Sequence, residues 1–347
     1  MTEIEAEPIA QPGPPLCDLH IHVGGAVAPH ILYAIAHQQG FKLPVKNYWE
    51  FVQLVTADPR KMKGLDDYLK ILHEYTEKIQ SSPAAIERAI YEIIGKEFRG
   101  SNVNHIELRF NPMKRNLGGE RDLDHIIHAA IRGMDRATLE YGVTAGLIFC
   151  MAREFTVEMN EIIVDKAIKY RHRGIIGVDI AGPEKLKLEL RDDKEIAAYA
   201  RLFAKARDAG LGTTVHTGET SDTGVEGVMS VLKHWKPERI GHGIWAHKSK
   251  EAMAWLREHK IVLELCPTSN IDTHAVADVR EFKAIVRTFL AEKVQITLNT
   301  DGPYALRTNM RNEVDMMAEH KILSEEELAH TFDTARAASF IRERRPD

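Results

Sequence analysis

The sequence predicts an α/β protein of the (β/α)8 TIM-barrel class. Short apolar runs typical of strands alternate with helix-length segments from residue 104 onward, and the run Leu16–Val23 brings the number of expected strands to eight. Neither a Gly/Ser-rich linker nor a block of like charge interrupts the series, so residues 16–347 are expected to form one domain behind a tail at residues 1–15. A doubly wound sheet would show similar periodicity, but eight parallel strands close naturally into a barrel.

Composition narrows the class of partner. The chain has 347 residues, 44% of them hydrophobic and 28% charged, and a formal net charge of -5, so it offers no basic field for nucleic acid or an anionic membrane. The three cysteines are scattered, and the N-terminus lacks the basic start and apolar core of a signal peptide. No apolar run reaches membrane-spanning length. We therefore expect a cytoplasmic protein with a small-molecule substrate; the sequence leaves the oligomeric state open.

The first part of the chain combines one strand with several helical segments. The run Leu16–Val23 stops at two glycines, and a helical pattern begins at Pro29. Residues 40–63 are irregular and rich in aromatic side chains, which favours either a lid over one face of the domain or a packed surface excursion. Helical periodicity returns over Leu65–Ser81 and over Pro83–Phe98, where Pro83 suits a first helical turn.

The remaining chain alternates regularly. Further strands are expected at 104–110, 143–151, 175–180, 212–215, 239–242, 261–265 and 295–298. The helices expected between and after them span 122–141, 157–170, 193–209, 225–233, 248–259, 279–291 and 323–344.

Candidate metal ligands fall where these strands end. His20 and His22 project from one side of the first strand, because alternate residues of a strand share a face. His216 and His242 end the fifth and sixth strands, and Asp301 follows the eighth. All these ends open onto one rim of a barrel, so the side chains should converge. Three neutral imidazoles and a carboxylate suit one Zn²⁺ ion per subunit, or another borderline divalent ion, with a position left for water.

Two acidic residues near these histidines have candidate roles in the chemistry. Glu219 follows His216 by three residues and could bring a carboxyl group to the substrate without binding the metal, while His242 could orient a metal-activated water or accept its proton. Glu264 interrupts the apolar seventh strand and needs a partner. That partner is either His242, whose ring it would hold, or a barrel arginine such as Arg109.

Six short motifs, in this order along the chain, resemble the adenosine deaminase family of metal-dependent hydrolases in the amidohydrolase superfamily. The matching pieces are LHIH at 19–22, DIAG at 179–182, VHTGE at 215–219, RIGHG at 239–243, LELCPTSN at 263–270 and LNTD at 298–301. They span nearly all of the chain beyond the tail, and together they form a highly specific match. The resemblance implies a (β/α)8 barrel.

The resemblance also implies roles for individual residues. The zinc ligands would be His20, His22, His216 and Asp301. Glu219 would protonate N1 of a purine, and His242 would position and deprotonate the water, with Glu264 holding the His242 ring. The backbone at Gly182 would approach N3. The implied reaction is hydrolytic attack at C6 through a tetrahedral intermediate, with loss of ammonia.

Two positions depart from the family pattern. Family members that act on adenosine usually carry an aspartate, contacting the ribose 5′-hydroxyl, where this chain has Gly24, and a second one, contacting N7, where it has Gly302. Both changes affect substrate recognition. They are compatible with a 5′-modified nucleoside, such as a 5′-deoxy or 5′-thio adenosine or aminodeoxyfutalosine. The alternative is a non-nucleoside aminated heterocycle, such as a free aminopurine or a pterin.

Overall fold

The computed structural model describes residues 13–117 and 119–342. Residues 1–12, most of the tail predicted at 1–15, lie outside the described residues, as do residues 118 and 343–347. The first strand begins at Leu16, directly after the predicted tail.

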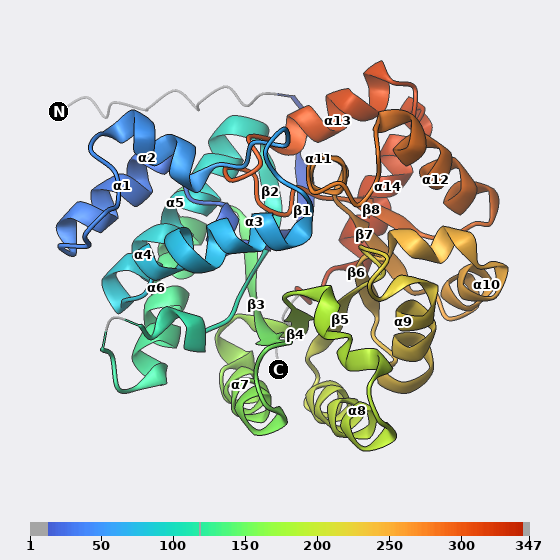
Figure 1. Ribbon diagram of the computed structural model, residues 1–347, viewed down its shortest axis with the longest axis horizontal. Coiled ribbons are helices and arrows are strands. Elements are labelled where there is room, and N and C mark those ends of the chain that lie inside the picture. Colours follow the sequence, from blue (N-terminus) through green and yellow to red (C-terminus); the bar gives the residue numbers. More distant parts are fainter. Residues whose placement is uncertain (1–12, 118, 343–347) are drawn as a thin grey trace, which may run out of the picture.

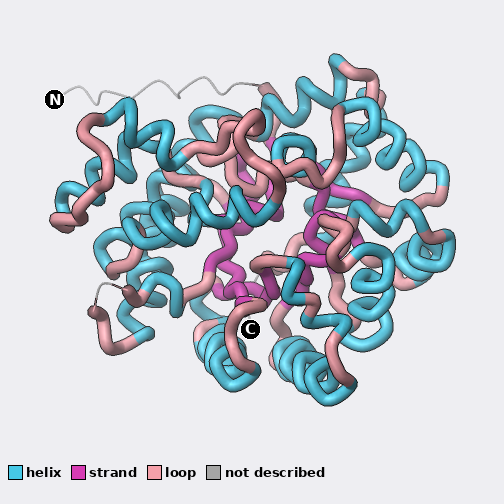
Figure 2. The backbone as a smooth tube through the Cα atoms, viewed as in Figure 1, coloured by secondary structure: helices cyan, strands magenta, loops and turns pink. Residues whose placement is uncertain are grey.

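Eight parallel strands form the centre of the molecule, and helices surround them (Figures 1 and 2). Each strand pairs with the next along the chain, in the order β1-β2-β3-β4-β5-β6-β7-β8. The strands are β1 Leu16–His22, β2 Val103–Phe110, β3 Thr144–Ala152, β4 Ile175–Ala181, β5 Gly212–Thr217, β6 Arg239–His242, β7 Val262–Leu265 and β8 Ile296–Leu298. All eight lie within two residues of their predicted bounds, so the predicted (β/α)8 barrel is confirmed.

The barrel closes between β1 and the residues that follow β8. Ile21 forms a parallel bridge with Asp301. The backbone N–H of Asp301 donates to the carbonyl of His20 at 2.8 Å, and the N–H of His22 donates to the carbonyl of Asp301 at 2.7 Å. The closure of the barrel therefore fixes three candidate metal ligands against one another.

Fourteen α-helices are present in the described part of the chain, and most of them cover the outside of the barrel. They are α1 Pro29–Gln38, α2 Tyr48–Val55, α3 Leu65–Ile71, α4 Glu77–Ile79, α5 Pro83–Ser101, α6 Leu123–Tyr141, α7 Val157–Lys169, α8 Asp193–Asp208, α9 Gly224–Ser230, α10 Lys250–Glu258, α11 Pro267–Asp272, α12 Val279–Ala291, α13 Met310–Glu319 and α14 Glu325–Ala338. Within the described ranges, no helix combines the length and apolarity needed to cross a membrane.

Local sequence signals explain where α5 begins and ends. The Ser82 side chain accepts the N–H of Ala85, and Pro83 occupies the first turn, where a missing N–H costs nothing. The helix ends at Ser101, and its C-cap residue Asn102 has a left-handed φ of 54°. Strand β2 begins at the next residue.

Residues 40–63 are more regular than predicted. Helix α2 begins after Asn47, whose side chain accepts the N–H of Glu50 at 3.0 Å, and it buries Phe51 and Val55. The N–H of Ala57 then donates to a backbone carbonyl in the loop after β8 at 2.7 Å. This stretch packs against the barrel, in agreement with the packed-excursion alternative.

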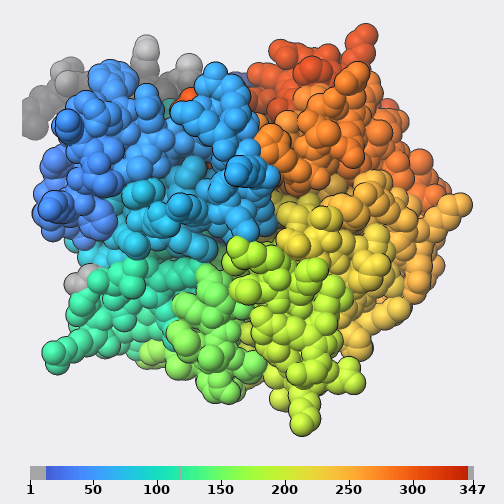
Figure 3. All heavy atoms as spheres, viewed as in Figure 1, coloured from blue at the N-terminus to red at the C-terminus, as the bar shows by residue number. Residues whose placement is uncertain are grey.

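The next stretch, residues 65–79, lies across the mouth of the barrel, and we call it the covering segment. It comprises α3, a π-helical turn over Leu72–Thr76, and α4. Asp66 pairs with Lys185 across the mouth at 2.6 Å. In the space-filling view, the sky-blue atoms of this region abut yellow-green and orange atoms from later parts of the chain (Figure 3). The covering segment therefore lies over the ends of the strands.

Candidate active site

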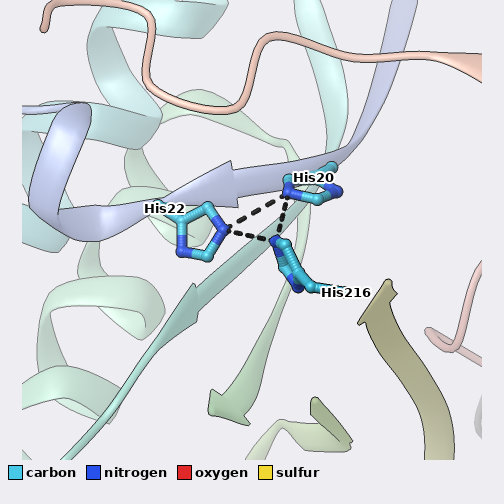
Figure 4. Close-up of side chains that lie close together, drawn as sticks. All are labelled: His20, His22 and His216. Atoms are coloured by element: carbon cyan, nitrogen blue, oxygen red, sulfur yellow. Dashed lines mark hydrogen bonds between the residues drawn. The ribbon is translucent and has the colours of Figure 1, made fainter. Parts of the chain in front are cut away.

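Three histidine side chains meet at the ends of β1 and β5 (Figure 4). The Nε2 atom of His22 lies 3.3 Å from that of His20 and 3.0 Å from that of His216. The Nε2 atoms of His20 and His216 are 3.0 Å apart. The predicted convergence of residues from distant parts of the sequence is thus present in the structure.

Two buried carboxylates set the tautomers of this cluster. Glu264 Oε2 lies 2.7 Å from Nδ1 of His20, and Asp179 Oδ1 lies 3.1 Å from Nδ1 of His216. Burial opposes ionisation of Asp179, but His216 and Arg109 outweigh it and lower its pKa below the ordinary value. Because an ionised carboxylate only accepts hydrogen bonds, each Nδ1 carries the proton and each Nε2 presents a lone pair.

The donor set fits a divalent cation. Burial lowers the pKa of His20 and of His22 well below the usual value, which keeps both rings neutral. Lone pairs that face one another at 3.0–3.3 Å need an electrophile between them. Ligand nitrogens about 2.0–2.1 Å from a tetrahedral Zn²⁺ would be roughly 3.3 Å apart, close to the spacing found. Cys266 forms a second grouping with His20 and His242 in the same place.

Asp301 completes the cluster on the side of β8. Its Oδ1 lies 3.7 Å from Nε2 of His22, and Ser269 donates to its Oδ2 at 2.6 Å. Its φ is 63°, a left-handed conformation that is uncommon outside glycine and often marks functional sites. The side chain is buried beside the histidines, where a carboxylate would serve as a fourth ligand.

His242 lies beside this cluster, but its partners differ from the prediction. The Asn270 side-chain nitrogen lies 2.9 Å from Nδ1 of His242, and Glu219 Oε2 lies 3.7 Å from its Nε2. Glu264 does not hold the His242 ring: it contacts His20, and Arg109 donates to it at 2.8 Å. The predicted partner of Glu264 was therefore wrong. The sequence shows that this acid needs a partner, but it does not reveal which histidine its side chain reaches inside the barrel. The contact between Glu264 and Arg109, the alternative that the sequence left open, is present.

Glu219 is a buried acid with one free oxygen. Its side chain is 3% exposed, and its Oε1 has no hydrogen-bond partner among the described residues. Burial, together with the carboxylates of Glu184 and Asp301, raises the pKa of Glu219 well above the usual value. Glu184 also accepts the backbone N–H of Glu219 at 3.1 Å. A neutral carboxyl group beside the histidines can donate a proton to a substrate.

Comparison with known proteins identifies the family. The sequence model described as adenosine deaminase matches residues 15–346. The chain belongs to the adenosine deaminase family. An adenosine deaminase of Clostridium kluyveri is 31% identical over 310 residues, which cover 88% of this chain and 84% of that protein. Its relatives make this chain a hydrolytic deaminase that acts on C–N bonds, of the purine deaminase type, in a metal-dependent family.

Solved structures share the fold. An adenine deaminase from Arthrobacter aurescens has a TM-score of 0.82 at 20% identity, with 95% of each chain covered. A Zn-bound amidohydrolase from Burkholderia ambifaria also has a TM-score of 0.82, at 22% identity, covering 95% of this chain and 86% of that one.

Three glycines were predicted to line the substrate site, and the structure places all three at the mouth. Gly182 follows β4 with a φ of 115°, and a Cβ there would meet a Glu154 carboxylate oxygen at 2.7 Å. Gly24 and Gly302 adjoin the covering segment. A small cavity of about 50 Å³ connects His22, Gly24 and Gly182.

Sequence reasoning missed several site residues of this family member. Asp179 interrupts an apolar strand in the same way as Glu264, so the same signal could have found it. Ser269 and Asn270 lie within a motif already noted, but their partners depend on the turn after β7. Tyr68 gave no signal, because an aromatic residue at helical spacing is typical of a core position.

Proposed function

We propose that this protein is a zinc-dependent hydrolytic deaminase that converts a 6-aminopurine nucleoside to its 6-oxo product and ammonia. The observation that carries the proposal is the buried Glu219 carboxyl group, with one unpartnered oxygen, beside three converging imidazoles. An acid next to a metal site is what hydrolysis at C6 of an aminopurine requires.

The proposed metal ligands are His20, His22, His216 and Asp301, with one Zn²⁺ per subunit. The metal would lower the pKa of a bound water toward neutrality and so supply the nucleophile. A likeness to a Zn-bound amidohydrolase supports the choice of metal.

The protein's own groups then have separate tasks. Glu219 protonates N1, which draws electrons from C6 and lets water add there. His242, 3.7 Å from Glu219, orients the attacking water and takes up its proton. The same proton is then returned to the amino nitrogen, so that the C6–N bond breaks and ammonia leaves. Glu264 and Asp179 hold the rings of His20 and His216. Gly182, with no side chain, lets the backbone approach N3 of the base.

Two classes of substrate are candidates. Gly24 has no carboxylate for a 5′-hydroxyl, which favours a nucleoside modified at the 5′ position, such as a 5′-deoxy or 5′-thio adenosine or aminodeoxyfutalosine. The second candidate is a ring without ribose, such as a free aminopurine or a pterin, and the same missing carboxylate favours it.

Ammonia release from a substrate panel tests the proposal. The panel holds adenosine, 5′-deoxyadenosine, a 5′-thioadenosine, aminodeoxyfutalosine, adenine and a pterin, each with native enzyme, chelated enzyme and chelated enzyme given Zn²⁺ again. We expect turnover of a nucleoside that chelation abolishes and Zn²⁺ restores. Turnover of adenine or the pterin alone would select the second candidate. No ammonia from any member, or turnover indifferent to chelation, would refute the proposal.

A further inference from the structure

The hydroxyl of Tyr68, on the covering segment, is buried without a hydrogen-bond partner among the described residues. The residue is 2% exposed, and its ring packs in a small cluster with Leu72, Met62 and Leu306. Packing accounts for the ring. It does not account for the hydroxyl, because a buried donor left unpaired is destabilising and rare in folded proteins.

Two glycines make room for this hydroxyl. A Cβ at Gly302 would lie 2.0 Å from Tyr68 Oη, and a Cβ at Gly25 would lie 2.9 Å from it. Neither glycine has a left-handed φ, so both are needed for space and not for backbone conformation. Tyr68 Oη thus occupies the volume that a side chain at position 302 would otherwise fill.

The hydroxyl faces the proposed reaction site. Gly302 directly follows the proposed ligand Asp301. Burial, then the carboxylates of Asp301 and Glu219, raises the pKa of Tyr68 well above the usual value, so the hydroxyl keeps its proton. It is therefore a hydrogen-bond donor at the mouth of the barrel.

The same segment fills the space at Gly24. A Cβ there would lie 3.3 Å from Glu77 Cγ and 3.4 Å from Glu77 Oε1. Arg115 fixes that carboxylate, with its Nη1 3.0 Å from Oε1. Both positions that lack a family aspartate thus lie against polar side chains of residues 65–79. The Glu77 carboxylate is engaged by Arg115, whereas the Tyr68 hydroxyl is left without a partner among the described residues.

We propose that Tyr68 is a specificity-determining residue that donates a hydrogen bond to N7 of the 6-aminopurine. The inference rests on the proposed function. N1 is bonded to C6, which bears the amino group, and N7 is bonded to the neighbouring C5, so these two ring acceptors lie on opposite sides of the amino group. Glu219, after β5, serves N1, so a donor beside the end of β8 meets N7 on the other side. A buried donor that needs its partner discriminates against an analogue that lacks it.

The test compares a nucleoside with its 7-deaza analogue, in which C–H replaces N7. The nucleoside is the one that the panel shows to be turned over best. Wild type should prefer the N7 compound in kcat/KM, and Tyr68→Phe should reduce that preference by about tenfold or more, because only the wild-type pair forms the hydrogen bond. Comparing the two ratios cancels the intrinsic difference in reactivity between the rings.

Tyr75→Phe is the matched control. Tyr75 lies on the same segment and packs against the main core, so its variant should keep the wild-type ratio. Tyr68→Phe should also keep or raise the Tm, since it removes an unpaired buried hydroxyl. An unchanged ratio in Tyr68→Phe, or an equal change in Tyr75→Phe, would overturn the inference while deamination itself stood. Absence of turnover in wild type would instead refute the proposed function on which it rests.

Discussion

Nδ1 of His20 lies 2.7 Å from Oε2 of Glu264, and Arg109 donates to the same oxygen at 2.8 Å. Arg239 lies 2.7 Å from the other oxygen. The carboxylate is therefore fixed on both sides, and it presents one defined acceptor to the imidazole. Through Arg109, which also donates to Asp179 at 3.0 Å, the supports of His20 and His216 form one buried network.

Glu264→Gln should weaken metal binding. The neutral amide accepts less strongly from His20, so we expect an affinity for Zn²⁺ lower by about 10–100-fold, measured by competition with a chromophoric chelator. Thermal stability should fall as well, because two buried arginines lose a shared counter-charge. Glu258→Gln, at an exposed position of α10, should change neither property. Wild-type affinity in a folded Glu264→Gln protein would contradict this account.

Glu219→Gln should separate turnover from metal binding. An amide cannot donate an acidic proton to N1, so kcat should fall by about 10²–10⁴-fold. Zn²⁺ per subunit, measured by elemental analysis, should stay unchanged because Glu219 is not among the proposed ligands. The control is Glu226→Gln on the exposed side of α9, which should retain full activity. Activity retained in Glu219→Gln would remove this residue from the mechanism.

Much of the barrel could be predicted because parallel strands covered on both faces leave a plain signal of short apolar runs between helical periods. The convergence of ligands followed from the same reasoning, since all strand ends open at one rim. Helices α2, α11 and α13 were missed. Helix α11 has only six residues and begins directly at Pro267, too short a stretch for periodicity to reveal.

The missed parts of the site depend on side-chain reach between elements. Glu264 was recognised as an acid that needs a partner, but both His20 and His242 end strands close to it, and only the register decides between them. Tyr68 depends on the path of the covering segment over Gly302, hundreds of residues away in sequence. Local pattern carries no information about such a contact.

Glu97 should make stability depend on pH. It lies buried on α5, and burial, then the Asp18 carboxylate, raises its pKa to about 8. In the unfolded chain its pKa is about 4.3, so between these values the folded state holds a proton that the unfolded state has lost. The contribution of this proton to the free energy of unfolding is therefore complete below about pH 4.3. It is lost as pH rises toward 8, by up to about 1.4 kcal/mol per pH unit.

Glu97→Gln should remove this part of the dependence of unfolding free energy on pH, because the amide does not titrate. Urea unfolding of wild type and variant at pH 5.5 and at pH 8.5, conditions about three units apart, measures the difference. Wild type should lose more stability than Glu97→Gln over that interval. The control is Glu87→Gln. Glu87 lies on the same helix, its side chain is partly exposed, and it pairs with Arg132. This variant should keep the wild-type dependence of unfolding free energy on pH. Parallel curves for wild type and Glu97→Gln would refute the assignment.

Gly302→Ala should be strongly destabilising only while Tyr68 keeps its hydroxyl. The new Cβ would lie 2.0 Å from Tyr68 Oη but 3.3 Å from its Cζ, so Tyr68→Phe changes an impossible contact into a tight one. We expect Gly302→Ala alone to cost about 1–3 kcal/mol of unfolding free energy. In the Tyr68→Phe background the cost should be smaller, with a coupling of about 0.5 kcal/mol or more.

A double-mutant cycle in urea measures that coupling. The control cycle pairs Tyr68→Phe with Gly100→Ala on α5, where a Cβ would meet nothing closer than Lys96 Nζ at 3.5 Å. The effects of those two substitutions on the free energy of unfolding should be additive, because the sites share no contact. If the effects of Gly302→Ala and Tyr68→Phe on the free energy of unfolding were also additive, the hydroxyl could not occupy the space beside Gly302. The steric basis for placing Tyr68 in the substrate site would then be lost, whatever the enzyme's activity.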